Sequence, residues 1–474
     1  MSPPYEIFTN SQLYKLHLAS IEILERIGVQ IPSEEALKLC VDAGAEVDFK
    51  NKIVKIPQYI VEECIRKTPH KVTLYSRDLK LKLVLEEGNV YFGTVGFATR
   101  IIDINTGQYR SLNREDLAKL TRVADALENI DFQLVMGQPI DVPLEIAELY
   151  QWLIAFENTR KHIVCQALNK RNAEIAVEMG SIITGGKEEL RRNPIMTFII
   201  CLNSPLIFGD GLTEALIVAS RYGVPVWVES GPLAGANSPV TLAGTVALNN
   251  AEVLAGLVIS KLVNPQSPFI YGSWSRSIDM RTGGVVLGGP EFALMRICTA
   301  QLARYYQIPS GGGGILCDSK TSDAQAGYEK MLTAILPAIA RLNLVCGMGL
   351  VGSENIASFE QLVIDNEVAG MVKRVLNGIK LDDDTLAIDI IKEVGHEGSF
   401  LSKKHTLKFA KIEHYIPKIS DRSSPDTWIR AGMKNTSQRA REQALKILSE
   451  YSPISLPKEV SEKLQSLILK LKTK

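Results

Sequence analysis

The chain lacks the cysteine spacings that would hold a metal ion or a disulfide framework. Its cysteines are odd in number and scattered, and no CxxC pair or cluster of histidine with cysteine occurs. Structural zinc sites and disulfide-rich folds need such spacings. We therefore expect no metal on this chain, and reduced thiols in mostly apolar surroundings at Cys40, Cys64, Cys165, Cys201, Cys298, Cys317 and Cys346.

An excess of positive charge is also missing. The 53 basic and 53 acidic residues give a net charge of zero, which argues against a nucleic-acid partner. No apolar run reaches the length of a membrane span, and no charged-then-apolar signal segment opens the chain. The 474 residues are 46% hydrophobic and 22% charged, as in ordinary globular proteins. We expect a cytoplasmic protein without membrane association.

The segment before residue 113 predicts helices followed by short strands. Thr9 precedes a run of apolar residues at helical spacing that ends near Gly28, and Ser33 begins a second helix that ends near Gly44. Over residues 52–110, short alternating runs are separated by Gly, Asn and Asp, which is typical of strands and turns. We interpret residues 1–112 as an N-terminal helix and strand extension.

From residue 113 to residue 434, helical segments alternate with short apolar runs at the spacing of a βα unit. With an eighth strand expected near residues 390–402, this pattern predicts an α/β protein with a (β/α)8 TIM barrel, whose site lies at the C-terminal ends of the strands. A doubly wound parallel sheet remains an alternative. Residues 435–474 predict a C-terminal helical tail, amphipathic and exposed over 435–470. The seven apolar runs are DFQLVMGQP, HIVCQAL, MTFIICLNSP, VPVWVESGP, PFIYGSW, the stretch around Ile308, and LNLVCGMGL.

Four consecutive glycines, Gly311, Gly312, Gly313 and Gly314, follow the sixth predicted strand. Their backbone amides could approach a ligand closely, as in a phosphate cradle. However, the Lys-Ser/Thr ending of a P-loop is absent. A flexible loop, or a shelf for a bulky flat ligand at the barrel mouth, explains the run at least as well.

Asp318 and Lys320 come next, in CDSKTSDAQAGYEK. Ser322 with Gln325 resembles a capping box, and Asp323 also suits a helix start. Capping alone does not require an acid and a lysine beside a glycine run on the rim. Asp318 and Lys320 are therefore candidates for catalytic work, with a structural role equally open.

Aromatic and charged residues gather in YGSWSRSIDMRTGG, just past a predicted barrel strand. Aromatic faces attract cations that have no N–H to donate, although core packing is the usual role of such residues. Trp274 is the least core-like of them, because Ser and Arg flank it. The candidate binding residues on this and neighbouring rim loops are Phe97, Glu229, Tyr271, Trp274, Arg276 and His405.

Buried polar groups and histidines give weaker signals. Asn249 and Glu252 share one face of an apolar helix, where an inter-helix hydrogen bond is slightly favoured over a functional role. His396 and His405 lie in the polar segment HEGSFLSKKHT near the expected eighth strand, and His162 is a further candidate for acid–base work. A lone histidine is more often structural.

Several segments taken together resemble the trimethylamine methyltransferase family. They are NSPVTLAGTVALNNAEVLAG, DMRTGG, the glycine run followed by DSKTSDAQAGYEK, FEQLVIDNE and GSFLSKKHT. The resemblance covers nearly the whole chain in matching order, from FTNSQLYKLH to the C-terminal helix. It implies a TIM-barrel enzyme that methylates the cobalt of a corrinoid carried by a cognate partner protein. It implies no cofactor on this chain, and Gly311 to Gly314 would then face the corrinoid. We also expect a homo-oligomer.

One departure from that family bears on the substrate. The resemblance implies a pyrrolysine just before the Asp-Ser/Ala-Lys element in trimethylamine-specific members, where it binds the neutral amine and makes it cationic. Here Leu316 is the nearest equivalent, with Ile315 as an alternative, and no pyrrolysine occurs. A quaternary amine is already cationic and needs no such activation. The resemblance therefore implies a quaternary amine substrate, with glycine betaine as the best guess and proline betaine or carnitine as alternatives.

Two other classes of function remain open from the sequence. A TIM-barrel lyase or isomerase could bind a phosphorylated substrate at Gly311–Gly314. A betaine-binding protein without enzymatic activity is a third option, although so large a barrel exceeds what binding needs. For a betaine, Tyr271 and Trp274 would hold the cationic head and Arg276 the carboxylate tail. Trp274 reaches that pocket only if its strand has already turned into a loop.

Overall fold

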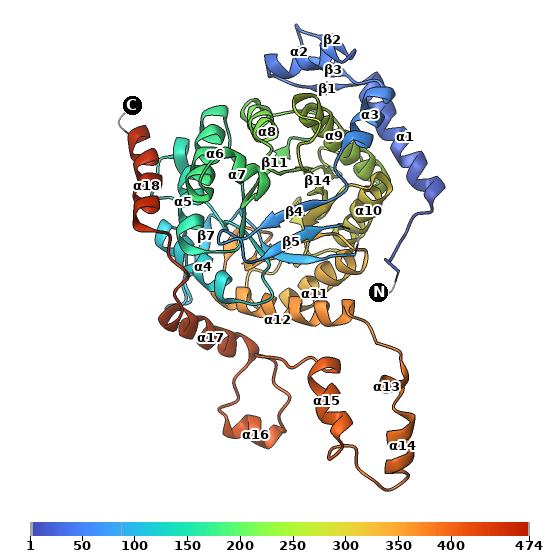
Figure 1. The fold of residues 1–474 in the computed structure, drawn as a ribbon, viewed down its shortest axis with the longest axis vertical. Coiled ribbons are helices and arrows are strands. Elements are labelled where there is room, and N and C mark those ends of the chain that lie inside the picture. Colours follow the sequence, from blue (N-terminus) through green and yellow to red (C-terminus); the bar gives the residue numbers. More distant parts are fainter. Residues whose placement is uncertain (1–2, 87, 473–474) are drawn as a thin grey trace.

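Eight parallel strands close into a barrel in the computed structural model, which describes residues 3–86 and 88–472 (Figure 1). Parallel strands with helices outside are buried on both faces, so they consist of near-continuous apolar runs rather than alternating ones. The residues of MTFIICL accordingly lie in the core, with only Cys201 half-buried. The barrel strands are β6 (Tyr91–Thr94), β9 (Phe132–Leu134), β10 (His162–Cys165), β11 (Met196–Leu202), β12 (Val226–Ser230), β14 (Phe269–Ser273), β17 (Ser310–Gly313) and β18 (Leu344–Met348).

An outer layer of helices packs around the strands, as the sequence pattern predicts. Several of these helices begin at a side-chain cap; Asn113, for example, forms a capping box with Asp116. The helices of this layer are α4 (Arg114–Ala126), the 3₁₀ turn η1 (Leu144–Ile146), α5 (Ala147–Asn158), α6 (Lys170–Thr184), α7 (Lys187–Arg192), α8 (Asp210–Tyr222), α9 (Leu242–Val263), α10 (Pro290–Tyr306), α11 (Ala324–Ile339) and α12 (Phe359–Leu376).

The TIM barrel and seven of its predicted strands are confirmed, but the predicted eighth strand is wrong. Residues 390–402 form the end of a helix and a loop, and their side chains are largely exposed. The remaining barrel strand is β6, which lies inside the predicted N-terminal extension and pairs with β18 and β9. Only these tertiary pairings identify the short run YFGT as part of the barrel. The division of the chain at residues 112 and 434 stays a prediction, with β6 belonging to the barrel.

The N-terminal segment covers one end and one side of the barrel. The hairpin of β4 and β5 lies across the N-terminal ends of the strands, where Tyr75 N–H donates to the Pro194 carbonyl and Arg77 N–H to the Arg160 carbonyl. The first helix packs on α9 and starts at a capping box of Thr9 and Gln12. These elements are α1 (Asn10–Arg26), β1 (Val29–Gln30), α2 (Glu34–Asp42), β2 (Glu46–Asp48), β3 (Ile53–Lys55), α3 (Gln58–Lys67), β4 (Val72–Tyr75) and β5 (Lys82–Leu85).

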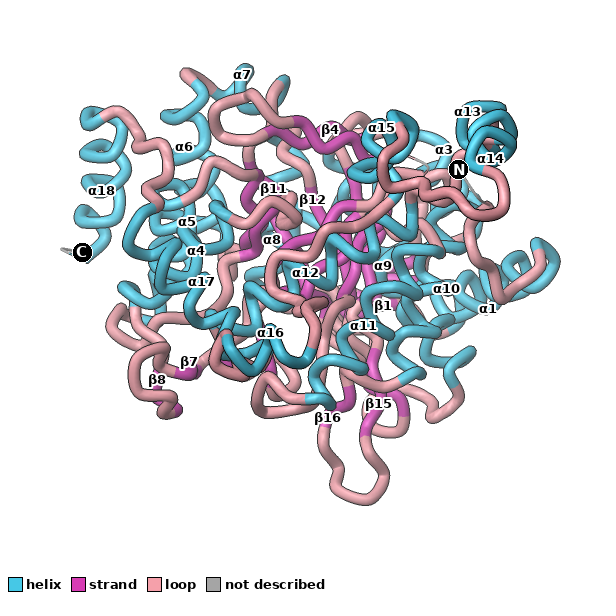
Figure 2. The backbone as a smooth tube through the Cα atoms, turned by 90° about the horizontal axis from the view of Figure 1, so that it is seen from below, coloured by secondary structure: helices cyan, strands magenta, loops and turns pink. Residues whose placement is uncertain are grey.

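Two small sheets stand at the opposite end of the barrel, around the C-terminal ends of the strands. Figure 2 shows β4 at one end of the molecule and β7, β8, β15 and β16 at the other. One sheet joins β13 (Leu233–Ala234), β15 (Arg276–Ile278) and β16 (Val285–Val286). The second joins β19 (Leu350–Val351), β20 (Ile356–Ala357), β7 (Arg100–Ile102) and β8 (Tyr109–Ser111).

A fully buried ion pair fixes the turns that leave β17 and β18. Lys330 Nζ on α11 lies 2.8 Å from Asp365 Oδ2 on α12, and both side chains are 0% exposed. The ammonium also donates to the carbonyl of Ile315, while Asp365 accepts from the N–H of Gly349. Buried charges are tolerated only when their hydrogen-bonding capacity is satisfied in this way. The pair therefore ties two rim loops to two outer helices.

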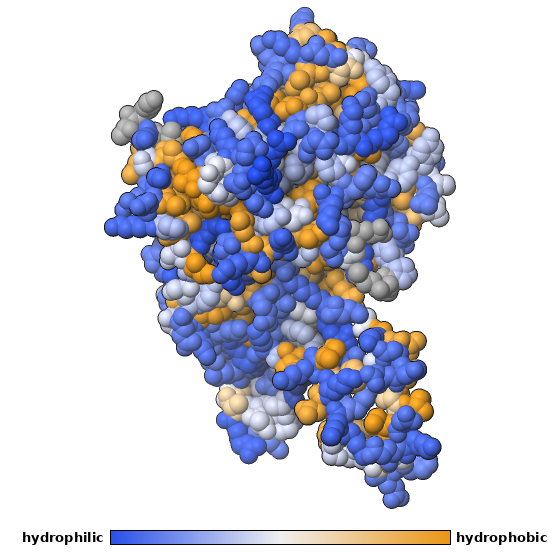
Figure 3. All heavy atoms as spheres, in the orientation of Figure 1, coloured by the Kyte–Doolittle hydropathy of each residue, from blue (hydrophilic) through white to orange (hydrophobic). Residues whose placement is uncertain are grey.

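The C-terminal part wraps around the barrel and then projects from it. The arm, residues 377–414, leaves the barrel after α12 and extends into solvent (Figure 1). It carries apolar side chains, visible in the lower right of Figure 3, of which Leu401 is 88% and Leu407 83% exposed. The helices of this part are α13 (Asp383–Leu386), α14 (Ile388–Val394), α15 (Lys404–Glu413), α16 (Pro425–Arg430), α17 (Thr436–Glu450) and α18 (Lys458–Lys472).

The predicted helical tail is confirmed as helical, but part of its apolar surface is covered by the barrel helices. Helix α17 packs on α12 and α4, and α18 packs on α5 and α6. Ala440, Ala444, Leu464 and Ile468 are buried in these contacts. An amphipathic helix gains stability by covering its apolar stripe, which explains the docking. The expected homo-oligomer stays a prediction.

One helix of the described chain, α9, is long and apolar enough to cross a membrane by length and composition. In its most apolar window, 83% of the residues are buried inside the structure. The helix packs on β12, β14 and α8 in the outer layer of the barrel. Its apolar character on all sides is that of a core helix enclosed between strands and neighbouring helices.

Candidate active site

A cavity of about 710 Å³ opens at the C-terminal ends of the barrel strands. Its walls come from the segments that follow β6, β11, β12, β14, β17 and β18, which is where TIM-barrel enzymes carry their chemistry. Its size suits a small organic ligand. Prominent among the lining residues are Phe97, Cys201, Asn203, Ser204, Glu229, Asn237, Trp274, Arg276, Lys320, Ser353, Glu354 and Asn355.

The structure brings five of the predicted site residues together in this cavity. Phe97, Glu229, Trp274, Arg276 and Lys320 all line it, although they lie on five different loops or strand ends. Phe97 is 37% exposed and marks the side on which the cavity meets the surface. Aromatic, acidic and basic groups therefore converge on one small volume.

Trp274 reaches the cavity because β14 ends at Ser273 and the chain has already turned into its loop. The indole is 4% exposed, and its Nε1–H donates to Glu354 Oε1 over 2.8 Å. Its ring centroid lies 6.2 Å from that of Phe97 and 6.5 Å from that of Phe292. These contacts hold one face of an electron-rich ring at the barrel mouth.

The glycine run is not a loop, which corrects the prediction of a shelf or phosphate cradle. Gly311, Gly312 and Gly313 belong to strand β17 and are buried. Their N–H and C=O groups serve the pairing with β14 and β18, and Gly314 N–H donates to the Cys346 carbonyl. No backbone amide of Gly311–Gly314 is therefore presented to a phosphate or a corrinoid.

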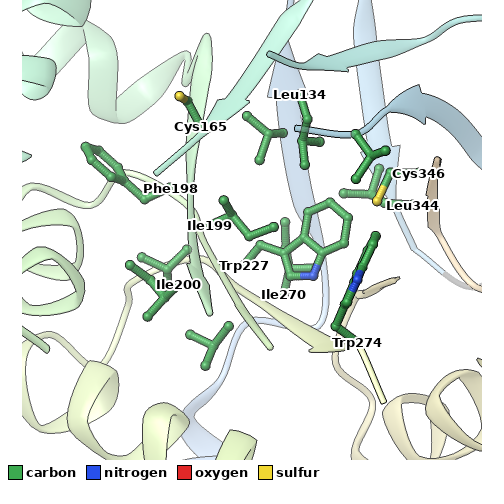
Figure 4. Close-up of a cluster of buried hydrophobic side chains, with 14 of the residues drawn as sticks. Leu134, Cys165, Phe198, Ile199, Ile200, Trp227, Ile270, Trp274, Leu344 and Cys346 are labelled. Carbon is green, nitrogen blue, oxygen red and sulfur yellow. The ribbon is translucent and has the colours of Figure 1, made fainter. Parts of the chain in front are cut away.

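The glycines make room for large side chains. A Cβ at Gly311 would lie 2.6 Å from the Trp227 ring, and a Cβ at Gly313 would lie 2.9 Å from the Trp274 ring. Figure 4 shows both indoles in one buried cluster. A strand without side chains is what allows Trp274 to pack against the barrel wall beside the cavity.

Two buried carboxyl groups, Glu229 and Glu354, face the cavity. Glu229 ends β12, and Cys201 donates its thiol proton to Glu229 Oε1 over 3.3 Å. Burial raises the pKa of Glu229 to about 7, against the lowering effects of Cys201, Arg296 and Arg276. Burial likewise raises the pKa of Glu354 to about 8, although Arg276 and the Trp274 N–H act in the opposite direction. Such pairs of displaced carboxyl pKa values are typical of functional sites.

Two arginines complete the electrostatics of the site. Arg276 is half-buried on β15, and Arg296 on α10 is fully buried with its guanidinium over the Phe292 ring. Burial lowers the pKa of Arg296 to about 10, and Arg296 still donates from Nη2 to the Ser275 carbonyl over 2.5 Å. Among the residues that the structure describes, Arg276 Nε, Arg296 Nε, Arg296 Nη1 and Glu229 Oε2 are buried without a hydrogen-bond partner. Of these groups, Arg276 Nε and Glu229 Oε2 belong to residues that line the cavity. Orphaned polar groups there indicate a place for a polar ligand or ordered water.

Tyr271 does not join the cavity and has a structural role. Its hydroxyl donates to Asn250 Oδ1 on α9, and its ring lies 6.0 Å from that of Tyr306 on α10. Asn250 in turn donates to Tyr306 and to Ser20 of α1. The alternation of β14 points Tyr271 toward this helix layer, away from the barrel mouth.

Of the predicted residues that follow the glycines, some line the cavity and others do not. Leu316 is 0% exposed and exchanges hydrogen bonds with the Thr333 hydroxyl on α11, so it does not line the cavity. Asp318 lies behind the wall, where it accepts from the N–H groups of Leu287 and Gly288. Asp318 therefore positions a cavity loop, and of the predicted catalytic pair only Lys320 lines the cavity.

His405 and the other histidines are not part of the site. His405 lies half-buried on α15 in the arm, with Nε2 2.9 Å from the Asp384 carbonyl. Its predicted place on the rim depended on the eighth strand near 390–402, which is absent. His396 is exposed in the same arm, whereas His162 is buried, and burial lowers its pKa to about 4. His162 is bonded to Thr197 and Tyr75 as a structural group.

Glu252 supports the cavity without touching it. Its carboxylate accepts from Leu206 N–H over 2.7 Å and from the Ser204 hydroxyl over 2.8 Å. It thereby holds the loop after β11, which carries Asn203 and Ser204 into the cavity wall. The predicted hydrogen-bonding role is confirmed, although the partner is a rim loop rather than another helix.

Sequence reasoning missed Glu354, Arg296 and Cys201. Glu354 follows the seventh apolar run in LVGSEN, and a search for acids after every predicted strand would have found it. Arg296 lies in an apolar helix, as Glu252 does. A charged side chain in such a helix must be paired or have a function, and this signal could have identified Arg296. No local signal distinguishes Cys201 from the other buried cysteines.

The described residues contain no group of three or more His, Cys, Asp or Glu side chains placed to hold a metal ion. The charged and aromatic groups that line the cavity are two carboxyl groups, a guanidinium group, an ammonium group and two aromatic rings. Such a set binds and orients an ionic organic ligand.

Comparisons with known proteins match the whole chain. Residues 1–474 match the family described as "Trimethylamine methyltransferase (MTTB)". The chain is 38% identical over 461 residues to "Trimethylamine methyltransferase MttB" of Desulfitobacterium hafniense strain DSM 10664 / DCB-2, covering 97% of this chain and 93% of that protein. It is 36% identical over 468 residues to "Glycine betaine methyltransferase" of Desulfitobacterium hafniense strain Y51, covering 98% and 97%. The Methanosarcina barkeri monomethylamine methyltransferase structure shares the fold, with a TM-score of 0.57, 12% identity, and coverage of 94% of this chain and 88% of that one.

Adding a methyl group at Gly313 should disturb Trp274. A Cβ there would lie 2.7 Å from Phe292 and 2.9 Å from Trp274, so Gly313→Ala should destabilise the fold by about 1–3 kcal/mol through overpacking. We expect a shifted tryptophan emission spectrum and a lower urea midpoint. Gly327→Ala on α11 is the control, because nothing lies within 4 Å of its added Cβ, and it should be neutral or stabilising by about 0.5–1 kcal/mol. Equal midpoints for both variants would contradict this packing role.

The raised pKa of Glu354 predicts a pH-dependent difference in stability. Folded Glu354 keeps its proton up to about pH 8, whereas the unfolded carboxyl loses it near 4.5, so wild-type stability falls as the pH rises between these values. Glu354→Gln has no such proton. Its free energy of unfolding should therefore rise relative to wild type between about pH 5 and about pH 8, by up to roughly 1.4 kcal/mol per pH unit.

Urea denaturation of both proteins across that pH range measures the difference. The exposed Glu174→Gln on α6 is the matched control and should run parallel to wild type. A Glu354→Gln curve that also stays parallel to wild type would mean that Glu354 is ionised in the folded protein.

Proposed function

The chain belongs to the trimethylamine methyltransferase family, and we propose that it moves a methyl group from a quaternary amine to the Co(I) of a corrinoid on a cognate partner protein. The observation that carries this proposal is the presence of an aromatic face and an unpaired guanidinium in one rim cavity. We further propose that the substrate is a betaine, with glycine betaine as the preferred candidate. A homologue at 36% identity that is named glycine betaine methyltransferase supports this choice.

The cationic head of a betaine would rest on the aromatic side of the cavity. A trimethylammonium group has no N–H, so it binds aromatic faces and carboxylates without directed hydrogen bonds. Trp274 and Phe97, whose ring centroids are 6.2 Å apart, provide such faces from two different loops. The hydrogen bond of Trp274 to Glu354 fixes the indole before a ligand arrives. A rigid wall lowers the entropic cost of holding the head.

The carboxylate tail would bind Arg276. No described acid lies within 4.0 Å of the Arg276 guanidinium in an ion pair, and its Nε–H has no partner. A guanidinium binds a carboxylate through two parallel hydrogen bonds, which orients the ligand as well as attracting it. Separate groups for the head and the tail would then fix the direction of the N–CH₃ bonds.

The chemistry asks little of this chain beyond binding and orientation. The partner's reduced corrinoid supplies the nucleophile; the electron pair of the broken C–N bond stays on nitrogen, so a neutral tertiary amine leaves. The chain would hold the methyl carbon in line between nitrogen and the acceptor and exclude water from the cavity. Phe97 and Lys320, both exposed at the opening, stand where the partner protein would approach.

The aliphatic character of Leu316 supports a quaternary substrate over trimethylamine. A neutral amine needs activation at the position where trimethylamine-specific members are expected to have pyrrolysine. Leu316 is buried and has no group that could react with an amine. A quaternary amine is already cationic, so its leaving group requires no residue at this position. The alternative of a phosphorylated substrate at Gly311–Gly314 has lost its site, since these glycines form β17 and its end.

A substrate panel tests the proposal directly. The purified chain is mixed with a reduced corrinoid protein and one amine at a time, and the absorbance change from Co(I) to methyl-Co(III) is recorded. We expect conversion with at least one trimethylammonium compound, glycine betaine first, and none with trimethylamine, because Leu316 has no group that could react with a neutral amine. Conversion of trimethylamine at a comparable rate would contradict the substrate class.

Loss of Arg276 should weaken the binding of betaines more than that of quaternary amines without a carboxylate. Arg276→Ala should raise KM for a betaine by a factor equivalent to about 1.5–3 kcal/mol, the usual value of a charged hydrogen bond. KM for choline, which has no carboxylate, should change little. Arg281→Ala is the matched control on the same hairpin, since Arg281 is 88% exposed and pairs only with Asp279 among the described residues. An unchanged betaine KM in folded Arg276→Ala would place the tail elsewhere.

A further inference from the structure

We propose that Glu354 is the residue that selects a cationic head group in this cavity, by placing a carboxylate against the edge of the Trp274 ring on which the head rests. This inference deepens the proposed function and rests on it. It assigns a role to a residue that sequence patterns did not single out.

The loop after β18 holds Glu354 in an unusual conformation. Ser353 and Glu354 both have left-handed backbones, with φ of 51° and 72°. Non-glycine residues adopt this region only where surrounding contacts compensate for the strain. The contacts are present: Gly352 N–H donates to the Ser319 carbonyl, Ser353 N–H to the Cys317 carbonyl, and the Ser353 hydroxyl to Asp318 Oδ1. The loop after β17 thus forces the Glu354 side chain into the cavity.

The contact of Glu354 with Trp274 couples the acid to the aromatic face. Glu354 Oε1 accepts the indole N–H over 2.8 Å. A hydrogen bond to a carboxylate draws the N–H proton toward the acid and leaves the ring more electron-rich. A cation over that ring is attracted by the ring face and by the carboxylate at its edge. Glu354 therefore acts on a head group through charge and through the indole.

The surrounding charges leave Glu354 available to a ligand. Arg276 on β15 and Arg296 on α10 favour its ionised form, whereas Glu229 on β12 opposes it. Lys320 and Cys201 line the same cavity, and Cys346 of β18 also senses the Glu354 charge. Within the described part of the chain, no ion pair within 4.0 Å involves Glu354 or Arg276. Glu354 and Arg276 can thus bind the two ends of a zwitterion separately.

Glu229 is the weaker candidate for this role. Its Oε1 already accepts the Cys201 thiol, and its residue is 1% exposed against 6% for Glu354. The strongest charge acting on Glu229 is that of the fully buried Arg296, whereas for Glu354 it is that of Arg276 in the cavity wall. Both acids line the cavity, but Glu229 is coupled most strongly to the buried Arg296, whereas Glu354 is coupled to Arg276 and bonded to the indole on which the head would rest.

Binding of a cation should displace the proton of Glu354. In the free protein, burial raises the pKa of Glu354 to about 8, so much of it is neutral near pH 7. A bound trimethylammonium group stabilises the carboxylate and lowers this pKa. Wild-type protein should therefore release a proton when it binds a betaine at neutral pH, and its affinity should rise as the pH rises toward about 8.

The test compares two ligands that differ only in charge. Glycine betaine and 3,3-dimethylbutanoate have the same shape and the same carboxylate, but a neutral carbon replaces nitrogen in the second. Calorimetric titration of wild type should show tighter binding of the betaine. Glu354→Gln keeps an acceptor for the Trp274 N–H but removes the negative charge. It should therefore weaken binding of the betaine by roughly tenfold or more, and binding of the neutral analogue by less than about threefold. Glu174→Gln, exposed on α6, should change neither.

Each outcome decides the proposal. The proposal would be overturned if Glu354→Gln left the ratio of betaine affinity to analogue affinity unchanged. It would also be overturned if Glu229→Gln lowered that ratio and Glu354→Gln did not. If Glu354→Gln does not fold, Glu229→Gln is titrated in two buffers of different ionisation enthalpy, so that Glu354 is the cavity acid left to release a proton. Proton release with the betaine and not with the analogue supports the role, and its absence refutes it. Wild type that binds no quaternary ammonium compound would instead refute the proposed function itself.

Discussion

The arrangement of the cavity depends on one buried ion pair, Lys330–Asp365. Its ammonium and carboxylate bind the carbonyls of Ile315 and Gly347 and the N–H of Gly349, at the points where β17 and β18 become loops. In a medium of low polarity, an ion pair whose other hydrogen bonds are satisfied cannot shift without exposing an uncompensated charge. The pair therefore gives the two loops one permitted geometry, and Lys320 and Glu354 reach the same cavity because of it.

Other buried or half-buried carboxylates also hold rim loops by accepting hydrogen bonds from backbone N–H groups. Glu252 of α9 holds the loop after β11 through Leu206 N–H, and Asp318 holds the hairpin end at Leu287 and Gly288. In each case, a carboxylate satisfies backbone N–H groups that the ends of strands leave without partners. Buried acids that resemble catalytic residues in the sequence thus serve as scaffolding. Glu229 and Glu354 differ from these acids because they line the cavity and bond to the Cys201 and Trp274 side chains instead of to backbone N–H groups.

The electrostatics of the cavity suit a ligand with both charges. At and beside the cavity, Glu229, Glu354, Arg276 and Arg296 sum to zero when both carboxyl groups are ionised, and a bound zwitterion leaves that sum unchanged. The further charge, on Lys320, is exposed to water at the opening. A plain cation or anion would leave a net charge in a place with little water. The burial that raises the pKa of both acids also strengthens their attraction for a bound head group, because water screens less there. Affinity and selectivity thus have one physical origin.

The sequence by itself determined the barrel class, seven of its strands and the composition of the site. Apolar runs at βα spacing and polar residues at their ends are local signals, and they were sufficient to predict Phe97, Glu229, Trp274, Arg276 and Lys320. Tertiary structure alone decided the rest. The strand YFGT is recognised only by its partners β18 and β9. Alternation along a strand shows which side chains share a face but not which face points into the barrel, and only the structure shows that Tyr271 faces α9. Gly311–Gly313 became a strand because Trp227 and Trp274 fill the space that side chains would need. Glu354 entered the site through a strained loop that distant residues hold in place, and contacts between remote segments leave no local pattern in the chain.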